Sequence, residues 1–209
     1  MRNVIACMVV MAVFVPTLTH GQSSVSQVLH INTSDIPRYL DWAENSMPII
    51  VRDSQLPTSG GVCVPTYGAE EQGDLYVYNI TRDFESLMAV DLTAAVPARE
   101  IAKIASHRKI KAIDLWSSVL TPTNLNINAG DTYSMLVLAV STDQPDMYLS
   151  QLGVMEAGMN EAGHQDISVS VSHVMSGEFR NHLNVSIIAP TSGQLGAAMD
   201  TMRTATWAR

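Results

Sequence analysis

The order of apolar and polar residues predicts alternating strands and helices in the first half of the chain. Residues 26–32 alternate in polarity, as expected of a half-buried strand. A helix is predicted over residues 36–51, with Ser34 or Asp35 as its N-cap, and Pro48 should kink or end it. Two strands, two short helical pieces and a further strand should follow. These are residues 62–67, 75–80, 84–92, 97–107 and 110–119.

The second half of the chain predicts a similar order. An apolar strand over residues 133–140 precedes a helix over residues 146–162, which Gly163 is suited to close in a left-handed conformation. Strands over residues 167–175 and 183–188 and a helix over residues 194–207 complete the chain. The two halves therefore share a strand–helix–strand–strand–helix order.

A constant offset supports the view that this order is a repeat. Asp35 and Asp143 are 108 positions apart, at the predicted start of equivalent helices. The same offset relates six further identical pairs, which fall on equivalent helices and strands. These are Pro37 and Pro145, Met47 and Met155, Leu75 and Leu183, Val77 and Val185, Ile80 and Ile188, and Leu87 and Leu195. A duplicated supersecondary unit explains this placement.

Each predicted unit should bury one face of its sheet beneath its helices. In the first unit the alternation assigns Leu29, Ile31, Leu75 and Val77 to this face. The corresponding residues of the second unit are apolar as well. They are Val137, Ala139, Ile167, Val169, Val171, Leu183 and Val185. The opposite faces must then meet each other, either as stacked sheets or in a shared barrel.

This doubled unit resembles the dimeric α/β-barrel superfamily, whose members pair ferredoxin-like units through their sheets. The expected fold class is α+β, with two ferredoxin-like β-α-β-β-α repeats in one chain and antiparallel sheets that carry helices on one face. The repeats are assigned to residues 22–131 and 132–209. The segment 94–131 exceeds what a minimal unit needs and could be a closing strand, a lid or an interface.

The N-terminus has the layout of a secretory signal peptide. Arg2 precedes an apolar run over residues 4–15, and small residues suit cleavage after Gly21. We therefore expect residues 1–21 to be removed and the protein to be exported, either periplasmic or extracellular, with no membrane segment left. Removal would leave Cys63 as the only cysteine. The net charge of -8 argues against nucleic acid as a partner.

Polar and aromatic residues on the face away from the helices form the predicted ligand site. A cavity with aromatic walls and a few convergent polar groups suits a small apolar or aromatic ligand. The ligand-binding candidates are His30, Asn32, Tyr67, Tyr76, Tyr78, His182 and Asn184. A solvated sheet face would show the same alternation. His182 is the best candidate for a base or axial ligand, and no metal-binding spacing is present in the sequence.

Two functions fit these observations. The first is an exported small-molecule-binding or assembly domain, which could also form a homo-oligomer through its open sheet faces. No nucleophile elbow, phosphate loop or catalytic residue can be assigned from the sequence, which favours this function. The alternative comes from the resemblance and is a cofactor-independent monooxygenase-like or haem-binding enzyme of the α/β-barrel type. The sequence leaves both the enzymatic character and the cofactor open.

Overall fold

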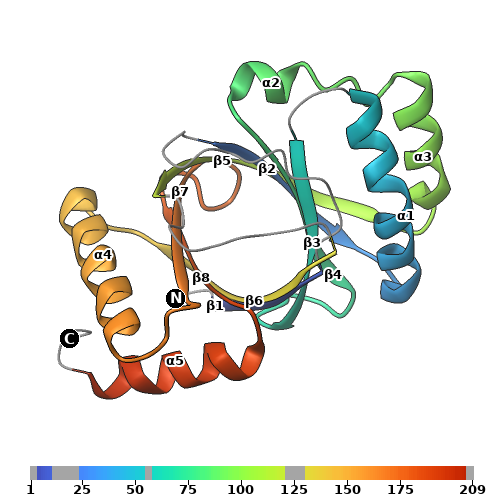
Figure 1. The fold of residues 1–209 in the computed structure, drawn as a ribbon. Helices are drawn as coiled ribbons and strands as arrows, with labels where there is room; N and C mark the ends of the chain where they lie inside the picture. The colour runs from blue at the N-terminus through green and yellow to red at the C-terminus, as the bar shows by residue number, and fades with distance from the viewer. Residues whose placement is uncertain (1–3, 11–23, 55–57, 121–129, 206–209) are drawn as a thin grey trace.

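The strands close into a barrel, and the helices pack on its outside (Figure 1). The computed structural model of the chain describes residues 4–10, 24–54, 58–120 and 130–205. The strands are β1 (Val4–Val10), β2 (Val25–Asn32), β3 (Thr58–Tyr67), β4 (Asp74–Thr81), β5 (Lys109–Leu120), β6 (Thr132–Val140), β7 (Ser168–Ser176) and β8 (Leu183–Ala189). The helices are α1 (Ile36–Ser54), α2 (Phe84–Met88), α3 (Ala95–Ala105), α4 (Pro145–Glu161) and α5 (Ser192–Thr204).

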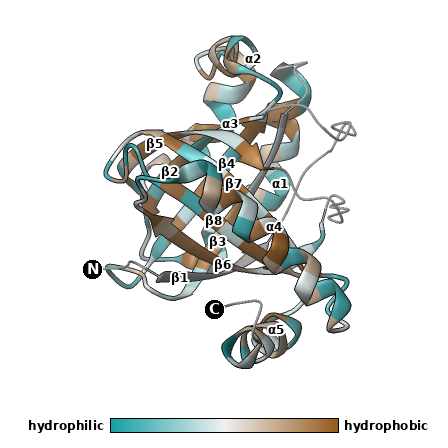
Figure 2. Cartoon of the chain, turned by 90° about the vertical axis from the view of Figure 1, so that its left-hand side faces the viewer, coloured by the Kyte–Doolittle hydropathy of each residue, from teal (hydrophilic) through white to brown (hydrophobic). Residues whose placement is uncertain are grey.

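The strand order around the barrel is β1-β3-β4-β2-β5-β7-β8-β6, and every neighbouring pair is antiparallel. Helices α1, α2 and α3 lie on one side of the barrel, and α4 and α5 lie on the other (Figure 1). Hydrophobic residues gather on the strands, whereas the helices are mixed (Figure 2). This is the α+β class that the sequence predicts, with the sheet curled into a single barrel.

Two cores lie between the barrel and its helices. The first contains Ile31, Leu75 and Val77, which the alternation assigns to the helix-facing side, and Leu29 packs against it. The second contains five further residues predicted for this side, which are Ile167, Val169, Val171, Leu183 and Val185. These predictions are confirmed.

The predicted face of β6 is wrong. Leu136 and Leu138 pack in the second core, and the neighbouring residues Val137 and Ala139 therefore face into the barrel. The segment Thr132–Val140 is apolar at most positions, so its sequence carries no alternation that would fix its phase. Tyr133 and Met135 accordingly pack inside the barrel, near Cys63.

The middle segment of the chain supplies the strand that joins the two sides. Strand β5 pairs with β2 on one edge and with β7 on the other. Helix α3, which precedes it, packs against α1, and Trp42 Nε1 donates a hydrogen bond to the Glu100 carbonyl 2.8 Å away. Residues 94–131 therefore include a barrel-closing strand, one of the three roles that the sequence leaves open.

Part of the predicted signal peptide also lies in the barrel. Val4–Val10 forms β1, which pairs with β3 and with β6. An apolar run suits a strand in a closed sheet as well as an export signal, so the sequence pattern alone does not separate these states. Removal of residues 1–21 stays a prediction. In the described part of the chain, no helix has the length and apolarity needed to cross a membrane.

Local signals explain several helix ends. Asp35 caps α1, because its carboxylate accepts a hydrogen bond from the Arg38 N–H at 3.1 Å. Pro48, which was predicted to kink or end α1, does not end it, because the helix continues to Ser54. Gly163 has φ of 96° just after α4, which confirms its predicted left-handed conformation.

Candidate functional site

A histidine and a buried carboxylate face each other inside one end of the barrel. His30 on β2 and Asp114 on β5 lie on the inner face, because Val28 pairs with Asp114 and His30 pairs with Ala112. His30 Nε2 lies 3.1 Å from Asp114 Oδ2, and the Asp114 side chain is only 2% exposed. A carboxylate can only accept, so Nε2 carries the hydrogen and Nδ1 of a neutral ring remains an acceptor.

Two neighbours hold this pair in place. The Tyr76 ring meets the His30 ring edge-on, with ring centroids 4.8 Å apart. On the other side, Gly177 in the β7–β8 hairpin has φ of 97°, and a Cβ built on it would lie 1.6 Å from Asp114 Oδ1. Only glycine allows the hairpin backbone to approach the carboxylate this closely.

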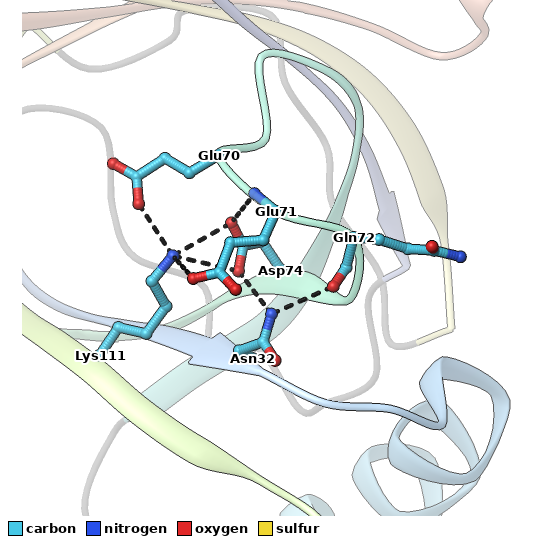
Figure 3. Close-up of polar contacts among 6 residues, drawn as sticks. All are labelled: Asn32, Glu70, Glu71, Gln72, Asp74 and Lys111. Carbon is cyan, nitrogen blue, oxygen red and sulfur yellow. Dashed lines mark hydrogen bonds and ion pairs between the residues drawn. The ribbon is translucent and has the colours of Figure 1, made fainter.

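A network of charged residues (Figure 3) contributes Glu70, Asp74 and Lys111 to a pocket wall that also includes His30. Lys111 Nζ lies 2.8 Å from Glu70 Oε2, 3.1 Å from Glu71 Oε1 and 3.3 Å from Asp74 Oδ2. Asn32 Nδ2 donates to Asp74 Oδ1 at 2.9 Å. The network thus joins the β3–β4 turn to β2 and β5, and its three carboxylates outnumber its single ammonium group.

The network changes the ionisation of its members. Burial raises the pKa of the Asp74 carboxyl, but hydrogen bonds from Asn32, from the Glu71 backbone and from Lys111 outweigh this and lower the pKa overall. The hydrogen bond to Glu70, followed by those to Glu71 and Asp74, raises the pKa of Lys111. Both groups therefore stay charged over a wide pH range.

The tyrosines inside the barrel stay protonated. Burial raises the pKa of Tyr76, and the nearby Asp74 and Glu70 carboxylates raise it further. Burial also raises the pKa of Tyr78. Neutral phenols donate hydrogen bonds, so these residues can orient a ligand while the base is supplied elsewhere.

A small polar pocket connects the histidine to the charged network. Its wall is formed by His30, Tyr76 and Lys111 together with Ile31, Glu70, Asp74 and Leu75. An imidazole whose Nε2 hydrogen is held by a carboxylate can accept a proton through Nδ1, and the charged pair with Asp114 then stabilises the imidazolium. The pocket therefore has the parts of a general base.

The structure brings together three of the predicted ligand-binding residues. His30 and Tyr76 line the pocket, and Asn32 holds Asp74 beside them. Tyr78 and Asn184 also face the barrel interior, on β4 and β8, because Tyr78 pairs with Val28 and Asn184 pairs with Ser172 on the inner rows.

The other two predicted residues lie elsewhere. Tyr67 ends β3 with 76% of its surface exposed. His182 lies just before β8, where its Nδ1 is 3.3 Å from the Arg180 carbonyl oxygen and its ring meets Phe179. Neither residue lines the described pocket.

The sequence analysis missed the partners of His30. Asp114 is the lone acid within an apolar stretch of β5. Because an unpaired charge in a buried strand is costly, this position could have indicated that Asp114 has a polar or charged partner. Lys111 on β5 also contacts Glu70 in the β3–β4 turn, 41 positions away, and no local sequence pattern links these two positions.

Comparison with known proteins identifies the fold. No protein-family model and no curated protein matches the chain. A protein of Lactobacillus acidophilus NCFM, provisionally assigned as a monooxygenase, has a TM-score of 0.59 and 10% identity over 90% of this chain and 84% of its own. A similarly assigned protein of Fusobacterium nucleatum has a TM-score of 0.58 and 8% identity, over 91% and 84%.

A third solved structure, provisionally assigned as chlorite dismutase TA0507, has a TM-score of 0.47 and 15% identity over 88% of this chain and 87% of its own. The first two likenesses show the fold alone, and these neighbours have dimeric α/β-barrel folds, which is the fold that the sequence resembles.

The described residues do not fit haem, which the resemblance implies as one alternative. An axial histidine needs a ring nitrogen directed into a cavity that can hold a porphyrin, whereas the described pocket beside His30 is small. His182 lies outside this pocket. Within the described ranges, no cluster of three or more His, Cys, Asp or Glu residues could hold a metal ion.

Proposed function

We propose that the protein is a cofactor-independent monooxygenase-like enzyme in which His30 removes a proton from a small aromatic substrate. The observation that carries this proposal is the contact of 3.1 Å between His30 Nε2 and buried Asp114 at a polar pocket. Asp114 orients the ring and stabilises its charged form, as a general base requires. The provisional names of the two structural neighbours agree with this reaction class.

The proposed reaction balances without a separate reductant. His30 takes a proton from an acidic methylene group, and the resulting carbanion reacts with dioxygen. One oxygen atom becomes a carbonyl oxygen of the product, and the other leaves as water with the two hydrogens of the methylene. The substrate thus supplies all four electrons that reduce dioxygen, while Tyr76 can donate a hydrogen bond to the anion.

Anthrone is a suitable probe, because its methylene lies between two aromatic rings and is acidic. We expect the full chain to consume dioxygen with anthrone and to place one labelled oxygen atom from ¹⁸O₂ in anthraquinone. His30→Gln keeps a hydrogen-bonding side chain but no base, and should lower the rate about 100-fold or more. His182→Gln is the matched control and should retain the rate of the unmodified protein. Equal rates for the His30 variant would refute the proposal.

A binding role without catalysis is the second candidate. It is favoured by the cluster of Cys63, Tyr76, Tyr78, Tyr133 and Met135 inside the barrel, which offers an apolar and aromatic surface to a ligand. Retention of an aromatic molecule on purification, with no dioxygen uptake by the loaded protein, would favour this role.

Export and duplication belong to the same proposal. We infer that residues 1–21 direct the protein out of the cytoplasm, on the strength of their charge and apolar run. We also infer that β2–β5 and β6–β8, with their helices, descend from one duplicated unit. The equal order of elements supports this, since Leu75 and Leu183 lie in equivalent strands and face equivalent cores.

A further inference from the structure

The pocket beside His30 is smaller than the substrate that the proposed function requires. As it stands, the pocket has room for about one water molecule. An aromatic ring system is several times larger than water, so part of the wall must move before such a molecule can reach His30. The part that moves should be the one that the barrel holds least firmly.

Most of this wall lies on paired strands. His30 and Ile31 lie on β2, which pairs with β4 and β5. Leu75 and Tyr76 lie on β4, which pairs with β2 and β3. Glu70 differs from them, because it lies in the turn between β3 and β4 and its side chain is 62% exposed. Glu70 can therefore move without breaking the strand pairing that closes the barrel.

Lys111 is the fixed partner of Glu70. The pairing of β5 with β2 skips Lys111, which is the extra residue of a β-bulge, and a bulge redirects the side chain that it carries. On its inner side, Lys111 Nζ lies 3.3 Å from Asp74 Oδ2, and the Asp74 side chain is only 5% exposed. On its outer side, Nζ lies 2.8 Å from Glu70 Oε2 (Figure 3). This ion pair therefore joins an anchored ammonium group to an exposed carboxylate.

The rest of the turn is fastened separately from this ion pair. The Thr33 N–H donates to the Gly73 carbonyl at 2.9 Å, and Asn32 Nδ2 donates to the Gln72 carbonyl at 3.2 Å. An ion pair with an exposed partner contributes little to stability and is screened by salt. The contact of Glu70 with Lys111 can therefore break while residues 72–74 stay in place.

We propose that Glu70 is a gate residue, which narrows the pocket when it binds Lys111 and admits the substrate when the two side chains separate. The inference rests on the proposed function, since it names the step by which an aromatic molecule reaches His30. Glu71 offers a comparison within the same turn. It lies 3.1 Å from Lys111 Nζ and its side chain is also 62% exposed, but it does not line the described pocket. Release of Glu71 should therefore leave the opening unchanged.

The test follows access to His30 with diethyl pyrocarbonate, which acylates a neutral imidazole nitrogen and requires no turnover. Mass spectrometry of the His30 peptide from the full chain gives the rate, and His182, outside the described pocket, is the internal reference. At about 50 mM NaCl, Glu70→Gln should raise the His30 rate at least fivefold, because Gln keeps the size of the side chain but loses the ion pair. Glu71→Gln is the matched control and should keep the slow rate of the unmodified protein.

A second measurement needs no variant. Raising NaCl to about 1 M should increase the His30 rate of the unmodified protein severalfold relative to His182, because salt screens the ion pair, and Glu70→Gln should show no such increase. Equal His30 rates in Glu70→Gln and the unmodified protein at low salt, or a His30 rate in the unmodified protein that does not respond to salt, would overturn the gate. An equal increase in Glu71→Gln would also overturn it.

These results do not depend on the oxidation of anthrone. Salt-sensitive access to His30 in a protein that leaves anthrone unchanged would refute the monooxygenase and retain the gate. Oxidation of anthrone by a protein whose His30 rate is the same with and without Glu70 would retain the monooxygenase and refute the gate. Failure of the gate and failure of the proposed function are therefore distinguishable.

Discussion

Asp74 ties together three separate segments at the pocket. Its carboxylate accepts hydrogen bonds from Asn32 on β2, from the Glu71 backbone in the β3–β4 turn and from Lys111 on β5. These contacts come from residues up to 42 positions away from Asp74 in the sequence. Loss of the negative charge on Asp74 should therefore loosen the wall of the pocket.

We predict that Asp74 makes the stability of the protein depend on acid. Its folded-state pKa is below the ordinary value near 4, so its contribution is complete above about pH 4 and is lost as the pH falls through the folded pKa. In urea unfolding followed by circular dichroism, Asp74→Asn should be less stable at pH 7 and lose less stability between pH 5 and 3. Glu44→Gln, at an exposed site on α1, is the control. Parallel pH profiles for the Asp74 variant and the unmodified protein would contradict this.

Two glycines at the ends of elements differ in what an added Cβ would contact. Gly163 ends α4 with φ of 96°, and a Cβ there would meet no atom within 4 Å. Gly177 in the β7–β8 hairpin has φ of 97°, but a Cβ there would overlap the Asp114 carboxylate. The two positions therefore separate backbone strain alone from strain combined with a collision with the Asp114 carboxylate.

We predict a clear difference between two alanine variants at these positions. Gly163→Ala should lower the free energy of unfolding by about 1 kcal/mol through backbone strain alone. Gly177→Ala should cost about 3 kcal/mol or more, because the overlap adds to the strain, and it should also displace Asp114 from His30. Urea unfolding gives the two energies, and the His30 ring resonances report the displacement. Similar energies together with unchanged His30 resonances would show that the hairpin does not restrain Asp114.

The sequence predicts individual helices and strands better than it predicts the pairing and register of the strands. Alternation assigns Leu29 and Ile31 to the correct face of β2 because polar residues separate them. It fails on β6, where Val137 and Ala139 lie among other apolar residues. The pairing of His30 with Asp114 depends on the register between β2 and β5, including a shift between His30 and Ile31, and no local pattern encodes that register.

At the scale of the whole molecule, the barrel depends on strands from both ends of the chain. Strand β5 joins the two sides at one seam, and β1 fills the other seam between β3 and β6. Alternation along each strand predicts inner and outer faces, but it does not say which edges pair. The shared barrel was therefore one of two expected arrangements, and the place of β1 was not foreseen.

We predict that the number of free thiols reports the fate of the N-terminus. In the full-length structure Cys63 is disulfide-bonded. The chain contains two cysteines, so removal of residues 1–21 leaves Cys63 alone and should yield one free thiol per denatured chain. Intact-mass spectrometry and thiol titration should give one thiol for chains that begin at Gln22, and none for chains that retain Met1. Exported protein that keeps residue 1 would contradict the proposed signal peptide.

The position of β1 has a consequence for the timing of export. A signal sequence must be accessible and extended when the export machinery engages it, whereas Val4–Val10 is paired on both edges in the closed barrel. If residues 1–21 are the signal, a precursor that closes the barrel in the cytoplasm makes its own signal sequence inaccessible to the export machinery. Export and folding would then compete for the same seven residues, and only chains captured before closure would leave the cytoplasm.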